Sequence, residues 1–224
     1  MKKIAILVMA MVVTMVGVVG AQTQKEIRKE RRQVEKMTTK ELNSKATKAA
    51  RKEAKRLKKQ GWLVAPGALP MDKQLDRVYL MQYEYDENLY PKYIMSEAMS
   101  IGENYDGAKT QALELAKQNL AGQVQTEITA IIENTVANKQ LAANEAATIT
   151  ETVLASKNLI SQALGRVMPV MACYRVVKNG NQEVLVRLAY NSDMAREAAK
   201  NVVRAELEKK GEKLHEQLDE VLGF

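Results

Sequence analysis

GRVMPVMACYRVVKNGNQEVLVRLAY, residues 165–190, contains two runs of alternating apolar and polar side chains on either side of an Asn-Gly-Asn turn sequence. Alternation with a period of two is typical of a β-strand with one buried face. The predicted buried face is Met168, Val170, Ala172, Tyr174 and Val176 in the first strand, and Val184, Val186, Leu188 and Tyr190 in the second. The stretch therefore predicts a β-hairpin, and a fold that is not purely helical.

The length of the turn decides which residues pair across this hairpin. A two-residue turn would pair Val176 with Glu183 and set apolar side chains opposite polar ones. A three-residue loop over 179–181 pairs Val176 with Val184 and keeps one apolar face, with Asn181 in the left-handed conformation. We therefore predict the three-residue loop.

Helices and one further strand are predicted around the hairpin from hydrophobic periodicity and capping residues. Before the hairpin, the first predicted helix begins at Met71 and is stopped by Pro91, and a strand follows over 92–103. The next helix begins near Asp106, with an apolar stripe that reaches Ile132, and a shorter helix spans about 144–157. After the hairpin, Asp193 caps a last helix that runs to about Leu222 and is interrupted at Gly211. This order indicates an α+β fold, in which a small antiparallel sheet (strand, two helices, β-hairpin, helix) packs one apolar face against helices.

Two of these elements have faces that can be assigned. The predicted apolar face of the strand over 92–103 is Tyr93, Met95, Met99 and Ile101. The long helix carries a stripe of small residues that includes Ala108, Ala112 and Ala116. Small side chains let a helix lie close on a sheet, so we expect this stripe to face the strands.

The run A-x-x-x-A-x-x-L-A-x-x-x-L-A from Ala108 to Ala121 is followed by a helical stretch, SQALGRVMPVMACYRV, the NGN turn, EVLVRLAY and a last helix. Over about 92–200 this series resembles the twenty-kilodalton (LPP-type) lipoprotein family of bacterial envelopes, and it is similar in element order to the N-terminal domain of the flagellar protein FlgT. The resemblance implies an envelope-associated, non-enzymatic domain without a known catalytic site or cofactor. The chain departs from the family in lacking the cysteine that carries the lipid, which puts tethering to the outer membrane in doubt.

Residues 1–21 are predicted to be a signal peptide. MKK is a positive n-region, residues 4–20 form an uncharged apolar run, and Val19 and Ala21 are the small residues that a signal peptidase reads. Cleavage after Ala21 would export the chain to the periplasm or cell envelope. The alternative is an uncleaved anchor with the body inside the cell, because the basic residues that follow resist translocation under the positive-inside rule.

Positive charge is concentrated in residues 22–60, which are predicted to form a basic helical arm. This segment has fifteen lysines and arginines against five glutamates, whereas residues 61–224 have seventeen against twenty-two acidic side chains. It has no glycine or proline, and GWLVAPGALP over 61–70 is predicted to link it to an α+β domain over 71–224. The predicted polyanion-binding residues are Lys25, Arg28, Lys29, Arg31, Arg32, Arg51, Lys52, Lys55, Arg56, Lys58 and Lys59.

A row of cations binds anionic surfaces with an affinity that falls as salt rises. The expected partner is an anionic envelope surface, such as lipid A phosphates or anionic lipid at the membrane periphery, or an acidic protein; self-association with the acidic body of another copy is a third candidate. Nucleic acid is disfavoured because the arm has no aromatic residue before Trp62 for base stacking, and it enters only in the alternative of an uncleaved anchor. The plain structural alternative is a solvated spacer helix.

The sequence predicts no catalytic residue, no cofactor site and no metal site. His215 is the single histidine and lies among charges, which supplies neither a metal cluster nor a triad. No GK[ST] sequence follows a glycine-rich loop, so phosphate-loop enzymes are excluded. An enzyme would need a pocket that brings together Glu97, Glu103 and Tyr105.

Cys173 with its neighbouring arginines and a cluster of tyrosines are two further candidate sites. Cys173 shares a strand face with Arg175 and Arg187, which would lower its pKa if they converged on it; an unreactive small residue is the simpler interpretation. Glu183 and Arg187 are predicted to form a solvated ion pair. The tyrosines that cluster before and within the first strand form either a binding platform or a packed core with exposed hydroxyls; they are Tyr79, Tyr83, Tyr85, Tyr90 and Tyr93.

Overall fold

The computed structural model describes residues 28–29, 31–33, 36, 40, 44–137, 141–165, 167–211, 218 and 222. The chain divides into two compact units, Met1–Lys45 and Ala46–Phe224, and each is described by itself. In the first unit the described residues from 28 to 40 are helical and exposed. The predicted signal peptide and His215 lie outside the described residues.

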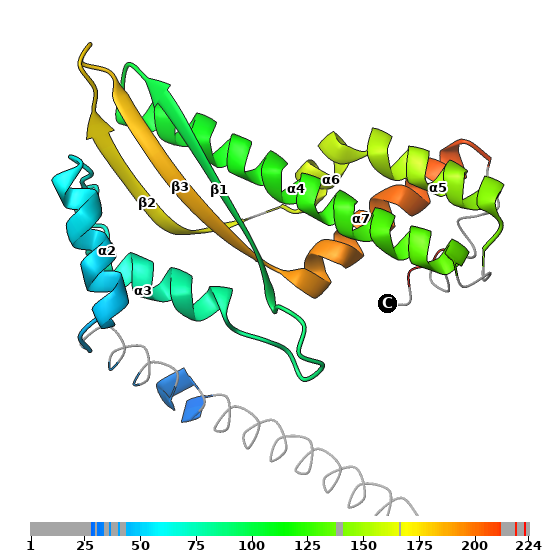
Figure 1. The fold of residues 1–224 in the computed structure, drawn as a ribbon, viewed down its shortest axis with the longest axis horizontal. Helices are drawn as coiled ribbons and strands as arrows, with labels where there is room; N and C mark the ends of the chain where they lie inside the picture. Colours follow the sequence, from blue (N-terminus) through cyan, green and yellow to red (C-terminus); the bar gives the residue numbers. More distant parts are fainter. Residues whose placement is uncertain are drawn as a thin grey trace, which may run out of the picture. The chain divides into compact units, whose positions relative to one another are not determined.

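The second unit has the predicted α+β fold, built on a three-stranded antiparallel sheet in the order β1-β3-β2. Helices lie on both sides of this sheet and beyond one end of it (Figure 1). The elements are α2 (Lys48–Lys59), α3 (Met71–Gln82), β1 (Tyr93–Gly102), α4 (Tyr105–Ala137), α5 (Ala143–Ala155), α6 (Lys157–Ala163), β2 (Met168–Val176), β3 (Gln182–Asn191) and α7 (Ser192–Lys209).

One face of the sheet packs against α4, and β1 turns small residues to this helix. The Ser96 hydroxyl donates to the Ala116 carbonyl at 2.8 Å. A Cβ added at Gly102 would lie 3.1 Å from the backbone nitrogen of Ala108, so a larger residue would push the helix away. Ala108, Ala112 and Ala116 are fully buried, which confirms that the small stripe of α4 faces the strands.

The opposite face is covered by α2 and α3, so the prediction of a single buried face is wrong. Tyr93 and Met95 of β1 pack against this second core, whereas Met99 and Ile101 farther along the strand are exposed. The apolar face predicted for β1 therefore points away from α4. The buried residues of the second core are Ala46, Ala50, Ala54, Leu57, Trp62, Met71, Leu75, Val78, Val170, Met171, Cys173, Leu185 and Ala189.

Residues 46–70 belong to the second unit, although the sequence assigned 46–60 to the arm and 61–70 to a linker. Trp62 is buried in the second core, and Leu63 forms a two-hydrogen-bond antiparallel bridge with Tyr174 at the outer edge of β2. The high content of lysine and arginine up to residue 60 had suggested that the arm ends there and the domain follows. A stripe of alanines on an otherwise basic helix nevertheless packs into the second core, mainly against α3, because small side chains allow close approach.

The hairpin forms, but its register differs from the prediction by two residues. Val176 pairs with Gln182 and not with Val184, so the connection has five residues, 177–181. A shift of two leaves every side chain on its original face because the strand period is two. The face that begins at Val184 on β3 is therefore buried as predicted.

Two details of this hairpin were also mispredicted. Gly180, at φ +83°, takes the left-handed position that was expected of Asn181. The strand has a β-bulge at Val170, and the Val170 side chain lies in the second core. Met168 pairs with Ala189 and therefore lies on the side of the sheet opposite to the predicted one. A bulge adds one residue to a strand and so inverts the alternation on one side of it.

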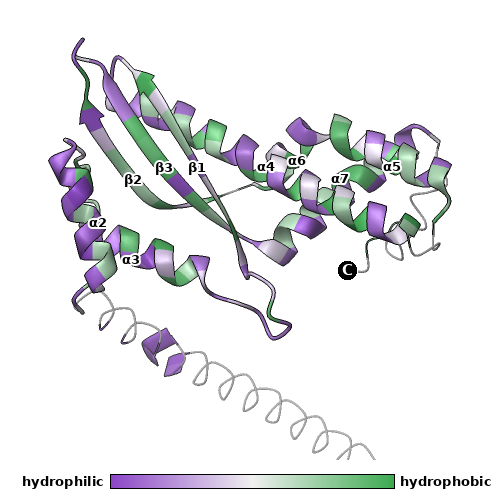
Figure 2. Ribbon diagram, in the orientation of Figure 1, coloured by the Kyte–Doolittle hydropathy of each residue, from purple (hydrophilic) through white to green (hydrophobic). Residues whose placement is uncertain are grey.

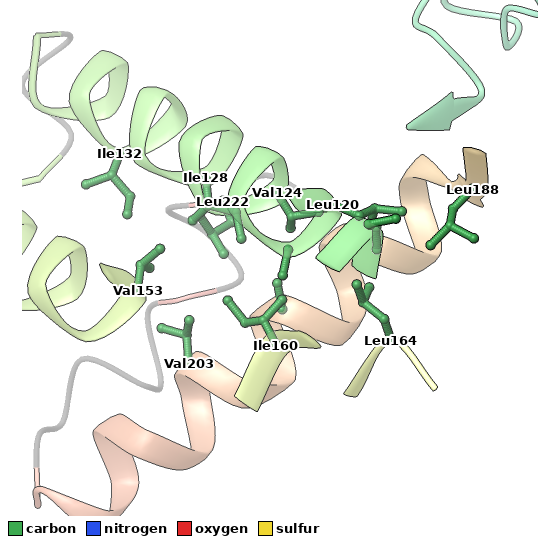
Figure 3. Packing of buried hydrophobic residues seen from close by; sticks show 14 of the residues in the cluster. Leu120, Val124, Ile128, Ile132, Val153, Ile160, Leu164, Leu188, Val203 and Leu222 are labelled. Carbon is green, nitrogen blue, oxygen red and sulfur yellow. The ribbon is translucent and has the colours of Figure 1, made fainter. Parts of the chain in front are cut away.

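Beyond the sheet, α4 continues and packs against α5, α6 and α7 (Figure 1). Ile128 and Ile132 of α4 meet Val153 of α5, Ile160 of α6 and Val203 of α7 in one buried cluster (Figure 3). The single helix α4, 33 residues long, therefore contributes to the core under the sheet and to the helical core beyond it.

Helix α7 begins two residues earlier than predicted. Its N-cap is Asn191, whose side chain accepts from the Met194 N–H at 2.9 Å, and not Asp193. The helix ends at Lys209, and Gly211 follows at φ +73°, which confirms the predicted interruption.

Amide side chains occupy both edges of the sheet. Asn119 of α4 donates to the Glu97 carbonyl at 3.1 Å on the β1 edge. On the β2 edge, the side-chain oxygen of Gln74 accepts from the Ala172 N–H at 2.8 Å, and its nitrogen donates to the Leu69 carbonyl at 2.6 Å. Free edge groups would be templates for pairing with another chain, so each of these contacts occupies one such group and restricts pairing at that point.

Candidate anion-binding face

Helix α2 has well-defined ends. The Thr47 hydroxyl accepts from the Ala50 N–H at 3.3 Å at the N-terminus. At the C-terminus Gly61 has φ +86°, and the Trp62 N–H donates to the Leu57 carbonyl at 3.1 Å, which forms a Schellman motif. Gln60 is the C-cap, and Gly61 is the left-handed residue that follows it.

One side of α2 is fixed to the body of the second unit. Ala50, Ala54 and Leu57 follow the i, i+4, i+7 spacing and are buried. The Thr47 N–H also donates to the Asp76 carboxylate of α3 at 3.0 Å. Because the helix is held by packing and by this hydrogen bond, its remaining side chains are attached to a fixed scaffold. Figure 2 shows that most residues of α2 are hydrophilic.

The other sides of α2 carry cations, and we call six of them the basic face. All six are exposed, and within the described part of the chain none of them forms an ion pair. The helix is 12 residues long, about 18 Å, so the charges are densely placed. The basic face consists of Lys48, Arg51, Lys52, Lys55, Lys58 and Lys59.

A groove of about 560 Å³ runs between the basic face and α3. Three lysines of the basic face line it, Lys52, Lys55 and Lys59, with Tyr79 on the α3 side. Glu53 is the single acidic residue in its lining. An anionic group that entered this groove would meet lysines on one wall and a tyrosine on the other.

Glu53 does not neutralise the basic face because it is committed to Arg56. The Arg56 guanidinium donates to the Glu53 carboxylate at 2.5 and 2.8 Å. This hydrogen bond lowers the pKa of Glu53, burial opposes the shift, and the charges of Arg56 and Arg187 lower the pKa further. The seventh cation of α2 is therefore paired, while the six of the basic face form no ion pair with any described residue.

The predicted polyanion-binding residues fall into two sets. Those on α2, from Arg51 to Lys59, are exposed, and all except Arg56 belong to the basic face. Those described in the first unit are also exposed; they are Arg28, Lys29, Arg31 and Arg32. Lys25 lies outside the described residues. Sequence reasoning omitted Lys48, which the helical spacing to Lys52 and Lys55 could have included.

The strand arginines beneath α2 add little to this face because each has an acidic partner. Arg175 binds Glu183 at 2.5 Å, and its guanidinium lies 4.8 Å from the centre of the Trp62 ring. Arg187 pairs with Glu97. The predicted pair between Glu183 and Arg187 is therefore wrong, since each of these side chains binds a different neighbour across the sheet.

Cys173 is fully buried in the second core. Burial raises the pKa of its thiol to about 12, which outweighs the lowering by the Arg187 charge. The thiol is protonated at neutral pH, so the interpretation as an unreactive core residue fits the structure better than the reactive one.

The residues that would have indicated an enzyme do not converge. Glu97 lies on the α3 side of the sheet with Arg187. Tyr105 lies on the α4 side, where its ring packs edge-on against Tyr174 with centroids 5.2 Å apart. Glu103 is exposed in the turn between β1 and α4. Among the described residues, no group of histidine, cysteine, aspartate and glutamate side chains could hold a metal ion.

A second exposed feature follows α3, which ends at Gln82 and not at the predicted stop, Pro91. We call residues 83–92 the tyrosine loop. Its two arms are joined by a bridge between Tyr85 and Pro91 and by the ion pair of Lys92 with Glu84 at 2.5 Å. The loop is therefore a hydrogen-bonded structure and not an unpaired linker.

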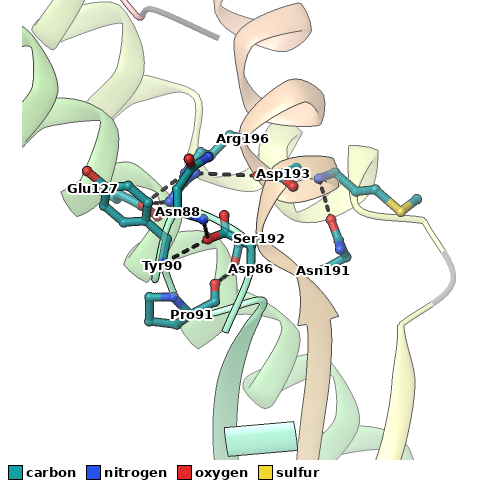
Figure 4. A network of polar contacts seen from close by, with 10 residues as sticks. Asp86, Asn88, Tyr90, Pro91, Glu127, Asn191, Ser192, Asp193 and Arg196 are labelled. Carbon is teal, nitrogen blue, oxygen red and sulfur yellow. Dashed lines mark hydrogen bonds and ion pairs between the residues drawn. The ribbon is translucent and has the colours of Figure 1, made fainter. Parts of the chain in front are cut away.

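The tip of the tyrosine loop is organised by one carboxylate. Asp86 accepts from the N–H groups of Asn88 and Tyr90 at 2.8 and 2.9 Å (Figure 4). Pro91 accepts from the Ser192 hydroxyl at 2.7 Å, which ties the loop to the start of α7. Leu89 has φ +63°, a conformation that costs a non-glycine residue about 1 kcal/mol.

The tyrosines are divided between packing and exposure. Tyr79 and Tyr93 pack against the second core, whereas Tyr83, Tyr85 and Tyr90 are exposed. Two leucines that the sequence reasoning did not consider, Leu80 and Leu89, are exposed beside them, and Leu89 is 81% exposed. Periodicity could not find this group because it lies largely in a loop.

Comparison with known protein families, with characterised proteins and with solved structures found no match to this chain. Within the described part of the chain, none of the helices combines the length and the hydropathy needed to cross a membrane.

Proposed function

We propose that this chain is an exported, non-enzymatic protein of the bacterial envelope whose basic helices bind an anionic surface. The observation that carries the proposal is the basic face of α2: six exposed cations that form no ion pair with any described residue, on a helix that is packed into the second core with α3. The exposed arginines and lysines of the first unit add to the same charge. The N-terminal sequence and the resemblance to envelope lipoproteins support the compartment.

A fixed basic helix binds anions at a lower entropic cost than a mobile one. The buried stripe of α2 orders the backbone in advance, so binding has to order only the ends of the lysine and arginine side chains. Each cation near an anionic lipid surface contributes about 1 kcal/mol at physiological salt. Six such cations give a strong but salt-sensitive attraction, which suits a peripheral contact.

The candidate partners are an anionic envelope surface and an acidic protein, including another copy of this chain. Residues 61–224 carry an excess of acidic side chains, so head-to-tail association is one way to satisfy the basic face. A phosphate-rich membrane surface is the other, and binding to both would weaken with salt in the same way.

The first test replaces three lysines of the basic face by glutamine, Lys52, Lys55 and Lys59, in the full chain. Binding to a soluble polyanion, dextran sulfate, and to phosphatidylglycerol-containing vesicles is measured at low and high salt. We expect a loss of about 100-fold in affinity for the vesicles and a weaker salt dependence, because about 3 kcal/mol of attraction is removed.

The matched control removes the same charge elsewhere, with Lys117, Lys157 and Lys178 changed to glutamine. These three lysines lie on α4, α6 and the β2–β3 loop, away from α2. We expect this variant to bind nearly as the unmodified chain does. Equal losses in both variants would show that only net charge matters and would contradict a specific basic face.

A further inference from the structure

The tyrosine loop carries the exposed apolar group that the basic face lacks. Leu80, Tyr83, Tyr85, Leu89 and Tyr90 are all more than half exposed, and they gather at the end of α3 and in the loop that follows it. Soluble proteins seldom expose so many large apolar side chains together without using them. Tyrosine and leucine are also the side chains that suit the boundary between water and lipid.

The conformation of Leu89 indicates that its exposure is built into the loop. Its backbone lies in the left-handed region, where glycine or asparagine is usual. The loop is nevertheless fixed, with Asp86 accepting two N–H groups at its tip and its own N–H bonded to the Tyr90 carbonyl at 2.9 Å. A strained and hydrogen-bonded turn thus presents a leucine to solvent.

The loop and the basic face are connected along one side of α3. Tyr79 lines the groove with Lys52, Lys55 and Lys59, and Tyr83 follows Tyr79 by four residues. Positions four apart lie on the same face of a helix. Figure 1 shows α3 leading from α2 toward the loop on the side of the sheet opposite α4. Cations and interfacial side chains therefore follow one another on this side of the second unit.

We propose that the anionic surface is a phospholipid bilayer, and that the tyrosine loop inserts into its interface with Leu89 at the tip while the basic face binds the headgroups. This inference rests on the proposed function and specifies its partner. A soluble acidic protein would satisfy the cations but would leave the exposed tyrosines and leucines without an apolar environment. Combining weak charge attraction with shallow insertion gives reversible binding at the membrane surface.

The experiment places an environment-sensitive fluorophore at the tip of the loop in the full chain. Asn88→Cys supplies the attachment site, because Asn88 is exposed and its structural hydrogen bond uses only its backbone. Cys173 does not compete for the label since it is fully buried. Lys178→Cys is the matched control, an exposed position in the loop at the opposite end of β3.

With vesicles of phosphatidylcholine and phosphatidylglycerol, we expect the label at position 88 to shift to an apolar environment and the label at position 178 to stay in water. Leu89→Asn should abolish the shift and reduce partitioning onto the vesicles about tenfold. This variant should fold, because asparagine tolerates the left-handed conformation better than leucine. Leu154→Asn removes a leucine that is 60% exposed on α5 and should change neither readout.

Other outcomes separate the two proposals. If the lysines of the basic face govern binding to vesicles and to dextran sulfate while the label at position 88 stays in water, the anion-binding function stands and the insertion is overturned. Equal shifts at positions 88 and 178 would show general adsorption and would also overturn it. If the chain binds neither vesicles nor dextran sulfate, both proposals fail.

Discussion

At the scale of the residue, Cys173 shows how burial outweighs nearby charge. Its thiol shares a sheet face with Arg187, yet burial raises its pKa from an ordinary 9.0 to about 12. Above pH 9 the unfolded chain has lost a proton that the folded chain still holds, so the free energy of unfolding must fall as pH rises toward 12. At pH 7 both states are protonated and the group has no effect.

The prediction for Cys173 has two measurements. A thiol reagent at pH 8 should modify the native chain far more slowly than the urea-unfolded chain. The unfolding free energy of the unmodified chain should decline by about 1 kcal/mol per pH unit between pH 9 and 12 relative to that of Cys173→Ala. Parallel pH curves for the two chains, or equally fast modification of the native thiol, would contradict the burial of this residue.

At the scale of the element, Gln74 fixes α3 to the edge of β2. Gln74→Met keeps the size of the side chain but leaves the Ala172 N–H and the Leu69 carbonyl without their partner. We expect the unfolding free energy to fall by about 2 to 4 kcal/mol, because unsatisfied buried groups cost about 1 to 3 kcal/mol each. Urea midpoints measure the change. Gln82→Met, at an exposed position on the same helix, should shift the midpoint little, and equal shifts would contradict the proposed edge contact.

The sequence predicted most of these elements but not all of their contacts. Alternation and capping located β1, α4, α5 and the hairpin, because each has a clear period. The pairing of Val176 was missed by two residues because face alternation is the same in both registers. The length of α3 was overestimated because Tyr83 and Tyr85 continue a helical pattern that the bridge to Pro91 ends. Such a tertiary contact is not visible in local periodicity.

At the scale of the whole molecule, charge and packing gave different divisions of the chain. The density of lysine and arginine located the exposed basic helix α2 in the sequence, because such a helix needs no tertiary partner to be recognised. The same charge hid the contribution of α2 to the second core, which depends on Ala50, Ala54 and Leu57. The tyrosine loop could be recognised as a candidate contact surface only from the structure, which shows that Leu89 and three of the tyrosines are exposed.

Truncation of the chain from its N-terminus tests whether residues 46–70 are part of the packed domain. A chain that begins at Ala46 keeps the second core and should melt close to the temperature of the full chain. A chain that begins at Met71 loses α2 and Trp62, whose buried ring alone contributes about 4 to 6 kcal/mol. That loss approaches the whole stability of an ordinary domain, so we expect the shorter chain not to fold cooperatively.

Circular dichroism measures both melting curves, and Trp62, the single tryptophan, gives an independent readout. Its emission should be that of a buried indole in the full chain and in the chain from Ala46, and should shift to that of an exposed indole on unfolding. A chain from Met71 that melts like the full chain would show that the sheet needs only α4 as cover. The basic face would then belong to a detachable arm, and the insertion of the tyrosine loop would have to be explained without a basic helix fixed on the same side of the sheet.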